Sequence, residues 1–129
     1  MAPTRMILCD TNIFIEFYRN NEDVINELQN IGVASLSVSA ISIGELYFGA
    51  RDRRELLKIK KHLSALNQIP IDVETSETTL YLLETYALSH RLSLPDAMIA
   101  ATALRHNFSL YTLNVKDFHF IEGLALHKT

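Results

Sequence analysis

The amino-acid sequence predicts one α/β domain, built as a three-layer α/β/α sandwich with a mostly parallel central sheet of about five short strands. Short apolar runs alternate along the chain with longer segments of helical periodicity, which is the pattern of successive βαβ units. The length of 129 residues is enough to bury one hydrophobic core, so we expect residues 1–129 to form a single domain. A content of 48% hydrophobic residues, with 4 Gly and 3 Pro, indicates a packed globular chain.

The strands are predicted from short runs of apolar or alternating residues. Residues 6–9 are all apolar, which is typical of a strand buried on both faces. Residues 34–39 alternate serine with apolar residues, and Pro70 favours an extended conformation for the residue before it. We expect strands over residues 6–9, 34–39, 69–71, 108–112 and 124–126.

The helices are predicted from apolar spacing and from capping residues. Apolar residues three and four apart predict a helix over residues 13–19, and Asn21 and Gly32 then bound a second one. A helix that begins at residue 93, with Pro95 in its first turn, is apolar almost all round up to Leu104 and should be the most buried. Further helices are expected over residues 41–49, 51–66 and 76–90, with a turn or short helix over 114–118.

Composition restricts the class of protein further. No apolar stretch approaches the ~18 residues that a transmembrane helix needs, and we expect a cytoplasmic protein. The single cysteine, Cys9, lies inside the first apolar run, so we expect a small buried hydrophobe rather than a redox group. The net charge of −3 disfavours a polyanionic partner, yet six of the twelve basic residues lie within residues 51–61: Arg51, Arg53, Arg54, Lys58, Lys60 and Lys61.

Three acidic residues lie where a polar side chain is unexpected. Asp10 directly follows the first strand, Glu45 lies within the helix after the second strand, and Asp96 lies in the first turn of the most apolar helix. Because helices begin along the carboxyl edge of a parallel sheet, Asp10, Asp96 and the loop after Thr112 could converge there. Asn114 and Asp117 in that loop are further candidates.

Each acid also has a purely structural interpretation. Asp10 could simply cap the helix that follows it, and Glu45 could complete a capping box with Ser42. Asp96 could simply interact with the positive end of the helix dipole, and Asp117 could cap a turn. Three or four carboxylates brought together would repel one another unless a cation compensates them.

The residue types favour one kind of cation. Oxygen ligands select Mg²⁺ or Mn²⁺ over Zn²⁺, and no His or Cys pair has the spacing of a zinc site. His90, His106 and His119 share no motif with the acids, so we expect them to be structural or surface residues. A carboxylate-bound Mg²⁺ commonly activates water and neutralises charge on a phosphate. The chemistry alone therefore favours hydrolysis of a phosphodiester.

Four segments in series resemble the PIN-domain nucleases and, within them, the VapC type of toxin from bacterial toxin–antitoxin pairs. The segments are residues 8–12 (LCDTN), 42–46 (SIGEL) with 48–50 (FGA), 94–103 (LPDAMIAATA) and 111–118 (YTLNVKDF). They follow the family's order and span nearly the whole chain. A haloacid-dehalogenase-like phosphatase is disfavoured, because its second Asp would stand where this chain has Asn12.

The resemblance assigns roles to these residues. It implies that Asp10, Glu45 and Asp96 bind Mg²⁺ or Mn²⁺ as catalytic residues. A fourth position falls at Asn114, where many PIN domains carry an acid, or at Asp117, where the VapC-like pattern has one. Thr11, Asn12 and Thr112 would supply hydrogen bonds that orient the acids.

The resemblance also implies an activity. The family's proteins are metal-dependent endoribonucleases, often acting on tRNA or rRNA, and we expect attack by metal-activated water that leaves a 5′-phosphate and a 3′-hydroxyl. They are typically homodimers silenced by a cognate antitoxin, here a VapB-like protein. The basic residues of 51–61 would then contact the RNA backbone, bind an acidic antitoxin segment or form a solvated helix face. The alternative is a catalytically silent PIN-like module that binds a protein or RNA partner, which the intact acids disfavour.

Overall fold

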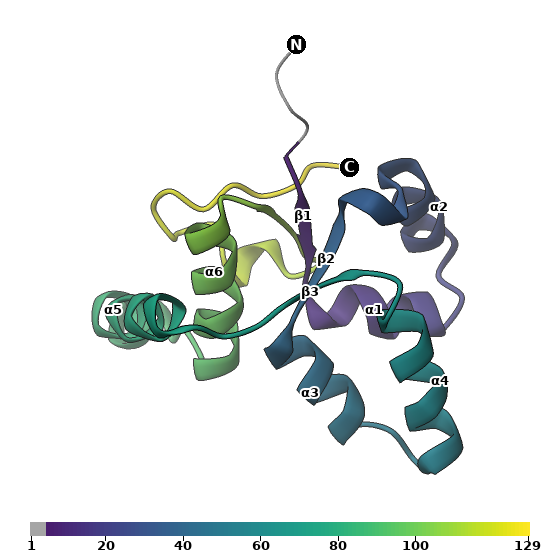
Figure 1. The fold of residues 1–129 in the computed structure, drawn as a ribbon. Helices are drawn as coiled ribbons and strands as arrows, with labels where there is room; N and C mark the ends of the chain where they lie inside the picture. The colour runs from purple at the N-terminus through teal and green to yellow at the C-terminus, as the bar shows by residue number, and fades with distance from the viewer. Residues whose placement is uncertain (1–4) are drawn as a thin grey trace.

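The computed structural model, which describes residues 5–129, forms the expected α/β/α sandwich around a parallel sheet (Figure 1). Four strands run in the order β3-β2-β1-β4, so β1 lies inside the sheet between β2 and β4. Their bounds are Ile7–Cys9 for β1, Leu36–Ser39 for β2, Asn67–Ile69 for β3 and Ser109–Tyr111 for β4. The prediction of a parallel sheet covered on both faces is confirmed.

Two of the predicted strands differ from the structure. Within residues 5–129 the sheet has four strands rather than about five, because the segment 124–126 makes only an isolated parallel bridge between Leu126 and Leu110. His127 fixes this segment by donating its backbone N–H to the Leu110 carbonyl and by pairing with Glu27 at 2.7 Å. The prediction of a strand over 69–71 was two residues too late, because Pro70 has no N–H to donate to a ladder.

Each predicted helix is present, and the bounds follow from the caps. The helices are α1 Thr11–Tyr18, α2 Glu22–Ile31, α3 Ala40–Phe48, α4 Arg53–Leu63, α5 Val73–His90 and α6 Leu94–His106, with 3₁₀ turns η1 Val33–Ser35 and η2 Val115–Asp117. Helix α5 begins three residues earlier than predicted, because the Asp72 carboxylate accepts the Thr75 N–H at 2.7 Å. Helix α4 begins two residues later than predicted, because Asp52 caps it by accepting the Glu55 N–H.

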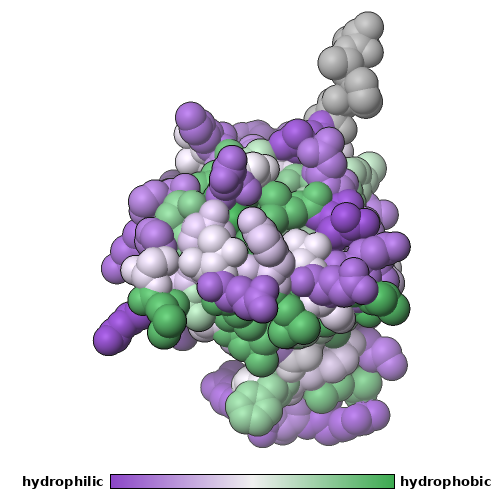
Figure 2. Space-filling model, turned by 90° about the vertical axis from the view of Figure 1, so that its left-hand side faces the viewer, coloured by the Kyte–Doolittle hydropathy of each residue, from purple (hydrophilic) through white to green (hydrophobic). Residues whose placement is uncertain are grey.

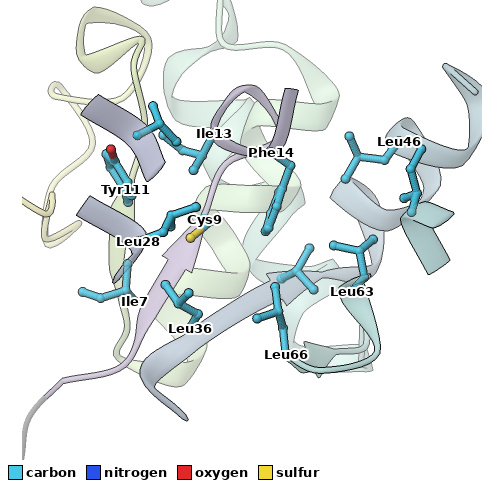
Figure 3. Packing of buried hydrophobic residues seen from close by; sticks show 13 residues of the cluster. Ile7, Cys9, Ile13, Phe14, Leu28, Leu36, Leu46, Leu63, Leu66 and Tyr111 are labelled. Carbon is cyan, nitrogen blue, oxygen red and sulfur yellow. The ribbon is translucent and has the colours of Figure 1, made fainter. Parts of the chain in front are cut away.

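The side chains of β1 alternate between two hydrophobic cores. Ile7 and Cys9 pack with α1 to α4 on one face of the sheet, and Figure 3 shows Cys9 among apolar side chains from these elements. Leu8 packs on the other face with α5 and α6, which lie on the opposite side of the sheet in Figure 1. Full burial raises the pKa of the Cys9 thiol to about 12, so Cys9 is the small buried hydrophobe that we predicted.

Helix α6 is the most buried helix of the described part, as predicted. Six of its residues are buried, four of which are alanines: Ala97, Ile99, Ala100, Ala101, Thr102 and Ala103. Small side chains let the long helix α5 pack closely against it, and the apolar run therefore serves packing. No helix of residues 5–129 is long and apolar enough to cross a membrane.

Shortening a buried side chain of β1 should lower the stability of the fold, because the strand is packed on both faces. We expect Leu8→Ala to lower the free energy of unfolding by about 2–5 kcal/mol, because Leu8 is fully buried and its removal leaves a cavity. Leu88→Ala, at a fully exposed position of α5, should change it by at most about 0.5 kcal/mol. Urea unfolding followed by circular dichroism measures both, and equal losses would contradict the assigned core.

Candidate active site

Asp10 is the buried acid of the site, at the carboxyl end of β1, and is 5% exposed. Its Oδ1 accepts the Thr11 backbone N–H at 2.8 Å, so the predicted capping of α1 does occur. Its Oδ2 accepts a hydrogen bond from the Thr112 hydroxyl, also at 2.8 Å. The Asp10 carboxylate is therefore fixed from both sides, by α1 and by the loop after β4.

Thr112 and Asn12 hold that loop against α1. Thr112 Oγ1 accepts the Asn114 backbone N–H at 3.0 Å, and Asn12 Nδ2 lies 3.5 Å from the same oxygen. The Asn12 side-chain oxygen also accepts the Leu113 N–H at 3.4 Å. Two of the three residues that were expected to orient the acids, Asn12 and Thr112, thus position the chain that leads to Asp117.

Glu45 projects from the middle of α3 and is exposed. The Thr11 hydroxyl lies 2.7 Å from Glu45 Oε1 and 2.8 Å from the buried Ser42 hydroxyl, so it joins Asp10's helix to α3. The capping-box interpretation of Glu45 is wrong, because Ser39 is the N-cap of α3 and accepts the Ser42 N–H. Sequence reasoning gave Ser42 the wrong role, although serine at the end of a strand could have identified Ser39 as the cap.

Asp96 lies in the first turn of α6, which Ser93 caps by accepting the Asp96 backbone N–H at 3.3 Å. Burial raises the pKa of the Asp96 carboxyl to about 6, and repulsion from Asp10, Asp117 and Glu45 adds to the shift. Burial likewise raises the pKa of Asp10, with Glu45 and Asp117 adding to it against the hydrogen bonds from Thr112 and Thr11. Asp10, Glu45, Asp96 and Asp117 therefore interact electrostatically.

The fourth predicted position falls on Asn114, which precedes η2, or on Asp117, which ends it. Asp117, the last residue of η2, is the one whose charge acts on Asp10 and Asp96. Asn114 precedes η2, is exposed, and donates its backbone N–H to Thr112. Of these two residues, Asp117 is therefore the one that acts electrostatically on Asp10 and Asp96, whereas Asn114 shapes the loop.

The donor set fits a hard divalent cation by its chemistry. Only hydrogen bonds lower the pKa values of Asp10 and Asp96, and no basic side chain among residues 5–129 contributes to lowering either. Their negative charge is thus uncompensated, and the donors are oxygens. Within the described residues no three carboxylate, imidazole or thiol groups converge closely enough to hold one ion.

The histidines and the basic residues of 51–61 do not contribute to the pKa shifts of Asp10 and Asp96. His90 stacks on Phe120 with ring centroids 4.2 Å apart, and His106 and His119 also pack near aromatic rings. Of the six basic residues of 51–61, Arg51 and Lys58 line a groove that reaches Glu45. All six are exposed, and the other four do not line that groove: Arg53, Arg54, Lys60 and Lys61.

Comparison with known proteins identifies the family. The sequence pattern that defines the PIN domain matches residues 7–121. The chain belongs to the PIN-domain family. Ribonuclease VapC1 of Rickettsia felis is similar to this PIN domain at 32% identity over 128 residues, which cover 93% of each protein. The tRNA(fMet)-specific endonuclease VapC of Shigella flexneri is 26% identical over 122 residues, covering 91% of this chain and 92% of that protein.

A solved structure supports the same grouping. A chain of a toxin–antitoxin complex from Klebsiella pneumoniae is 31% identical to this PIN domain and superposes with a TM-score of 0.79. The match covers 92% of this chain and 95% of that one. The domain is thus of the VapC type over nearly its whole length, as the sequence segments suggested.

The raised pKa of Asp96 predicts a pH dependence for the metal-free domain. Because the folded state binds this proton more tightly than the unfolded chain does, the resulting stabilisation is present below about pH 4 and is lost as the pH rises through about 6. Asp96→Asn cannot ionise there, so its free energy of unfolding should increase relative to wild type over this window. Urea unfolding in EDTA at several pH values measures the difference, and a pH-independent difference would contradict the assigned shift.

Proposed function

We propose that this PIN domain is a Mg²⁺- or Mn²⁺-dependent endoribonuclease that acts as the toxin of a VapBC-like pair. The observation that carries the proposal is a set of four interacting carboxylates, which lie at the end of β1 and on α3, α6 and η2. Within residues 5–129, no basic side chain lowers the pKa of Asp10 or Asp96. The ribonuclease names of the relatives from Rickettsia felis and Shigella flexneri support the same activity.

Asp10, Glu45, Asp96 and Asp117 would surround the cation. Because no three of the described acids converge closely enough to ligate one ion together, water would complete its coordination. When bound, a divalent cation supplies a polarised water and neutralises charge on the phosphate oxygens. Thr112 and Thr11 keep the Asp10 oxygens in place, and Thr11 also orients Glu45 through its 2.7 Å contact.

A VapB-like antitoxin and a second copy of the chain are the proposed partners. The similarity to a chain of the Klebsiella pneumoniae toxin–antitoxin complex supports an antitoxin. Self-association is supported by apolar side chains exposed on α5, including Val73, Leu80 and Tyr81. Figure 2 shows such hydrophobic residues exposed among hydrophilic ones on the face of α5 and α6. RNA, with tRNA as the first candidate, is the proposed substrate, in line with the name of the Shigella flexneri relative.

Cleavage of RNA by the purified chain tests the activity directly. We expect a mixed RNA pool to be cut in Mg²⁺ or Mn²⁺ and left intact in EDTA. Asp96→Asn should lower the rate by at least about 100-fold, because removing even an outer-shell partner of a metal costs 10- to 100-fold. Glu77→Gln, an exposed acid of α5, is the matched control and should cut like wild type.

Cleavage that survives EDTA would contradict the metal dependence. Undiminished cleavage by Asp96→Asn would refute the assigned site. The absence of any cleavage would favour the alternative of a silent PIN-like module that binds a partner.

Thermal stability tests metal binding apart from catalysis. Mg²⁺ at one hundred times its dissociation constant should stabilise the wild type by about 2.7 kcal/mol, because it binds the folded state and relieves carboxylate repulsion. Asp10→Asn should melt higher than wild type in EDTA and respond less to Mg²⁺. Calorimetry with and without millimolar Mg²⁺ measures both, and a wild-type melting temperature that ignores the metal would indicate an acidic pocket without a cation.

A further inference from the structure

A groove of about 650 Å³ runs between α1, α3 and α4 and reaches Glu45. We call it the α1–α4 groove and define it by Tyr18, Arg19, Glu45, Arg51 and Lys58 on its walls. Ile15, Leu46 and Ile59 also line it and supply an apolar floor. The groove therefore includes one of the four proposed catalytic acids, Glu45, and the other three do not line it.

The charge of this groove differs from that of the whole chain. The protein carries a net charge of −3, whereas the groove walls bring three cations, Arg19, Arg51 and Lys58, against Glu45 and Glu55. Glu55 holds the Arg51 guanidinium through bonds of 2.9 and 3.0 Å. The Arg19 side chain is 74% exposed, with Glu16 at 3.8 Å, and Lys58 is exposed. Lys58 and the exposed Arg19, whose contact with Glu16 is long, can therefore reach an anion.

An aromatic ring is fixed beside these cations. The Tyr18 side chain is 37% exposed, and its hydroxyl is hydrogen-bonded to His62 Nδ1 at 2.8 Å. Its ring also packs edge-on against Phe17 and His62, with centroids 5.8 and 5.5 Å away. Cations that follow a phosphate backbone beside an aromatic ring that stacks on a base are the usual elements of single-strand binding.

We infer that the α1–α4 groove binds the single-stranded RNA segment next to the scissile phosphate. Arg19 and Lys58 contact backbone phosphates, and Tyr18 stacks on a base. The inference rests on the proposed function. Of the basic residues of 51–61, it assigns RNA contact only to those that line the groove. Lys60, two residues beyond Lys58, lies about 200° further around the helix, on its opposite side. Arg19 was not identified from sequence, because it lies at the end of α1, far along the chain from residues 51–61.

RNA binding by a cleavage-deficient Asp96→Asn chain tests the groove. Fluorescence anisotropy with a labelled single-stranded RNA is measured over a range of salt concentrations in Mg²⁺. The double variant Arg19→Ala/Lys58→Ala should reduce the slope of log affinity against log salt by about 1.4, since each lost phosphate contact contributes about 0.7. Arg53→Ala/Lys60→Ala removes the same charge outside the groove and should leave the slope unchanged.

The aromatic ring has its own matched pair of variants in the same background. Tyr18→Ala should weaken RNA binding about tenfold, within the range reported for base stacking. Tyr18→Phe keeps the ring and should retain the affinity. Equal effects of the two double variants, or of the two Tyr18 variants, would overturn the inference. Competition by polyglutamate as effective as that by RNA would also overturn it, in favour of an acidic protein segment.

Cleavage and binding separate this inference from the proposed function. If the wild type cuts RNA and the groove variants bind RNA unchanged, the inference about the groove fails alone. If the wild type does not cut RNA and the groove variants still lose binding selectively, the groove assignment holds and the proposed nuclease activity fails.

Discussion

The burial of β1 on both of its faces is the constraint on which the rest of the structure depends. Ile7 and Cys9 pack against one layer of helices and Leu8 against the other, so a charged side chain within this strand would lie in one of the two cores. The first position that can carry a charge is therefore Asp10, where the strand ends. Its backbone N–H still pairs with the Tyr111 carbonyl at 2.9 Å, so the acid is held in register with β4.

Bringing these acids together destabilises the folded state, and the hydrogen bonds that they accept offset only part of this cost. Burial and mutual repulsion raise the pKa values of Asp10 and Asp96, while Thr11, Thr112 and Ser93 lower them. The acids do not serve the stability of the fold, because apolar residues at these positions would pack without the repulsion. Shifted pKa values from burial combined with specific charged neighbours are typical of functional sites.

The sequence predicted the fold class and the acids that follow regular elements. Asp10 and Asp96 could be placed because a strand end and a helix start are both local patterns. The role of Glu45 was ambiguous because Ser39 and Ser42 each lie three residues before a polar residue, and only the structure identifies the true cap. Tyr18, Arg19 and Lys58 could not be grouped, because their proximity depends on how α1, α3 and α4 pack. The predicted last strand was wrong because the short apolar run 124–126 resembles a strand in sequence, although it makes only one bridge, to Leu110.

Both edges of the sheet are poor templates for another chain. At one edge β3 is three residues long and is followed at once by Pro70, which has no N–H to offer. At the other edge the C-terminal segment occupies both backbone groups of Leu110, and the contact between His127 and Glu27 ties that segment to α2. A short open sheet would otherwise expose a row of unpaired amides and carbonyls, which invites aggregation by strand addition. The segment that ends at His127 thus helps to protect the β4 edge from aggregation by strand addition.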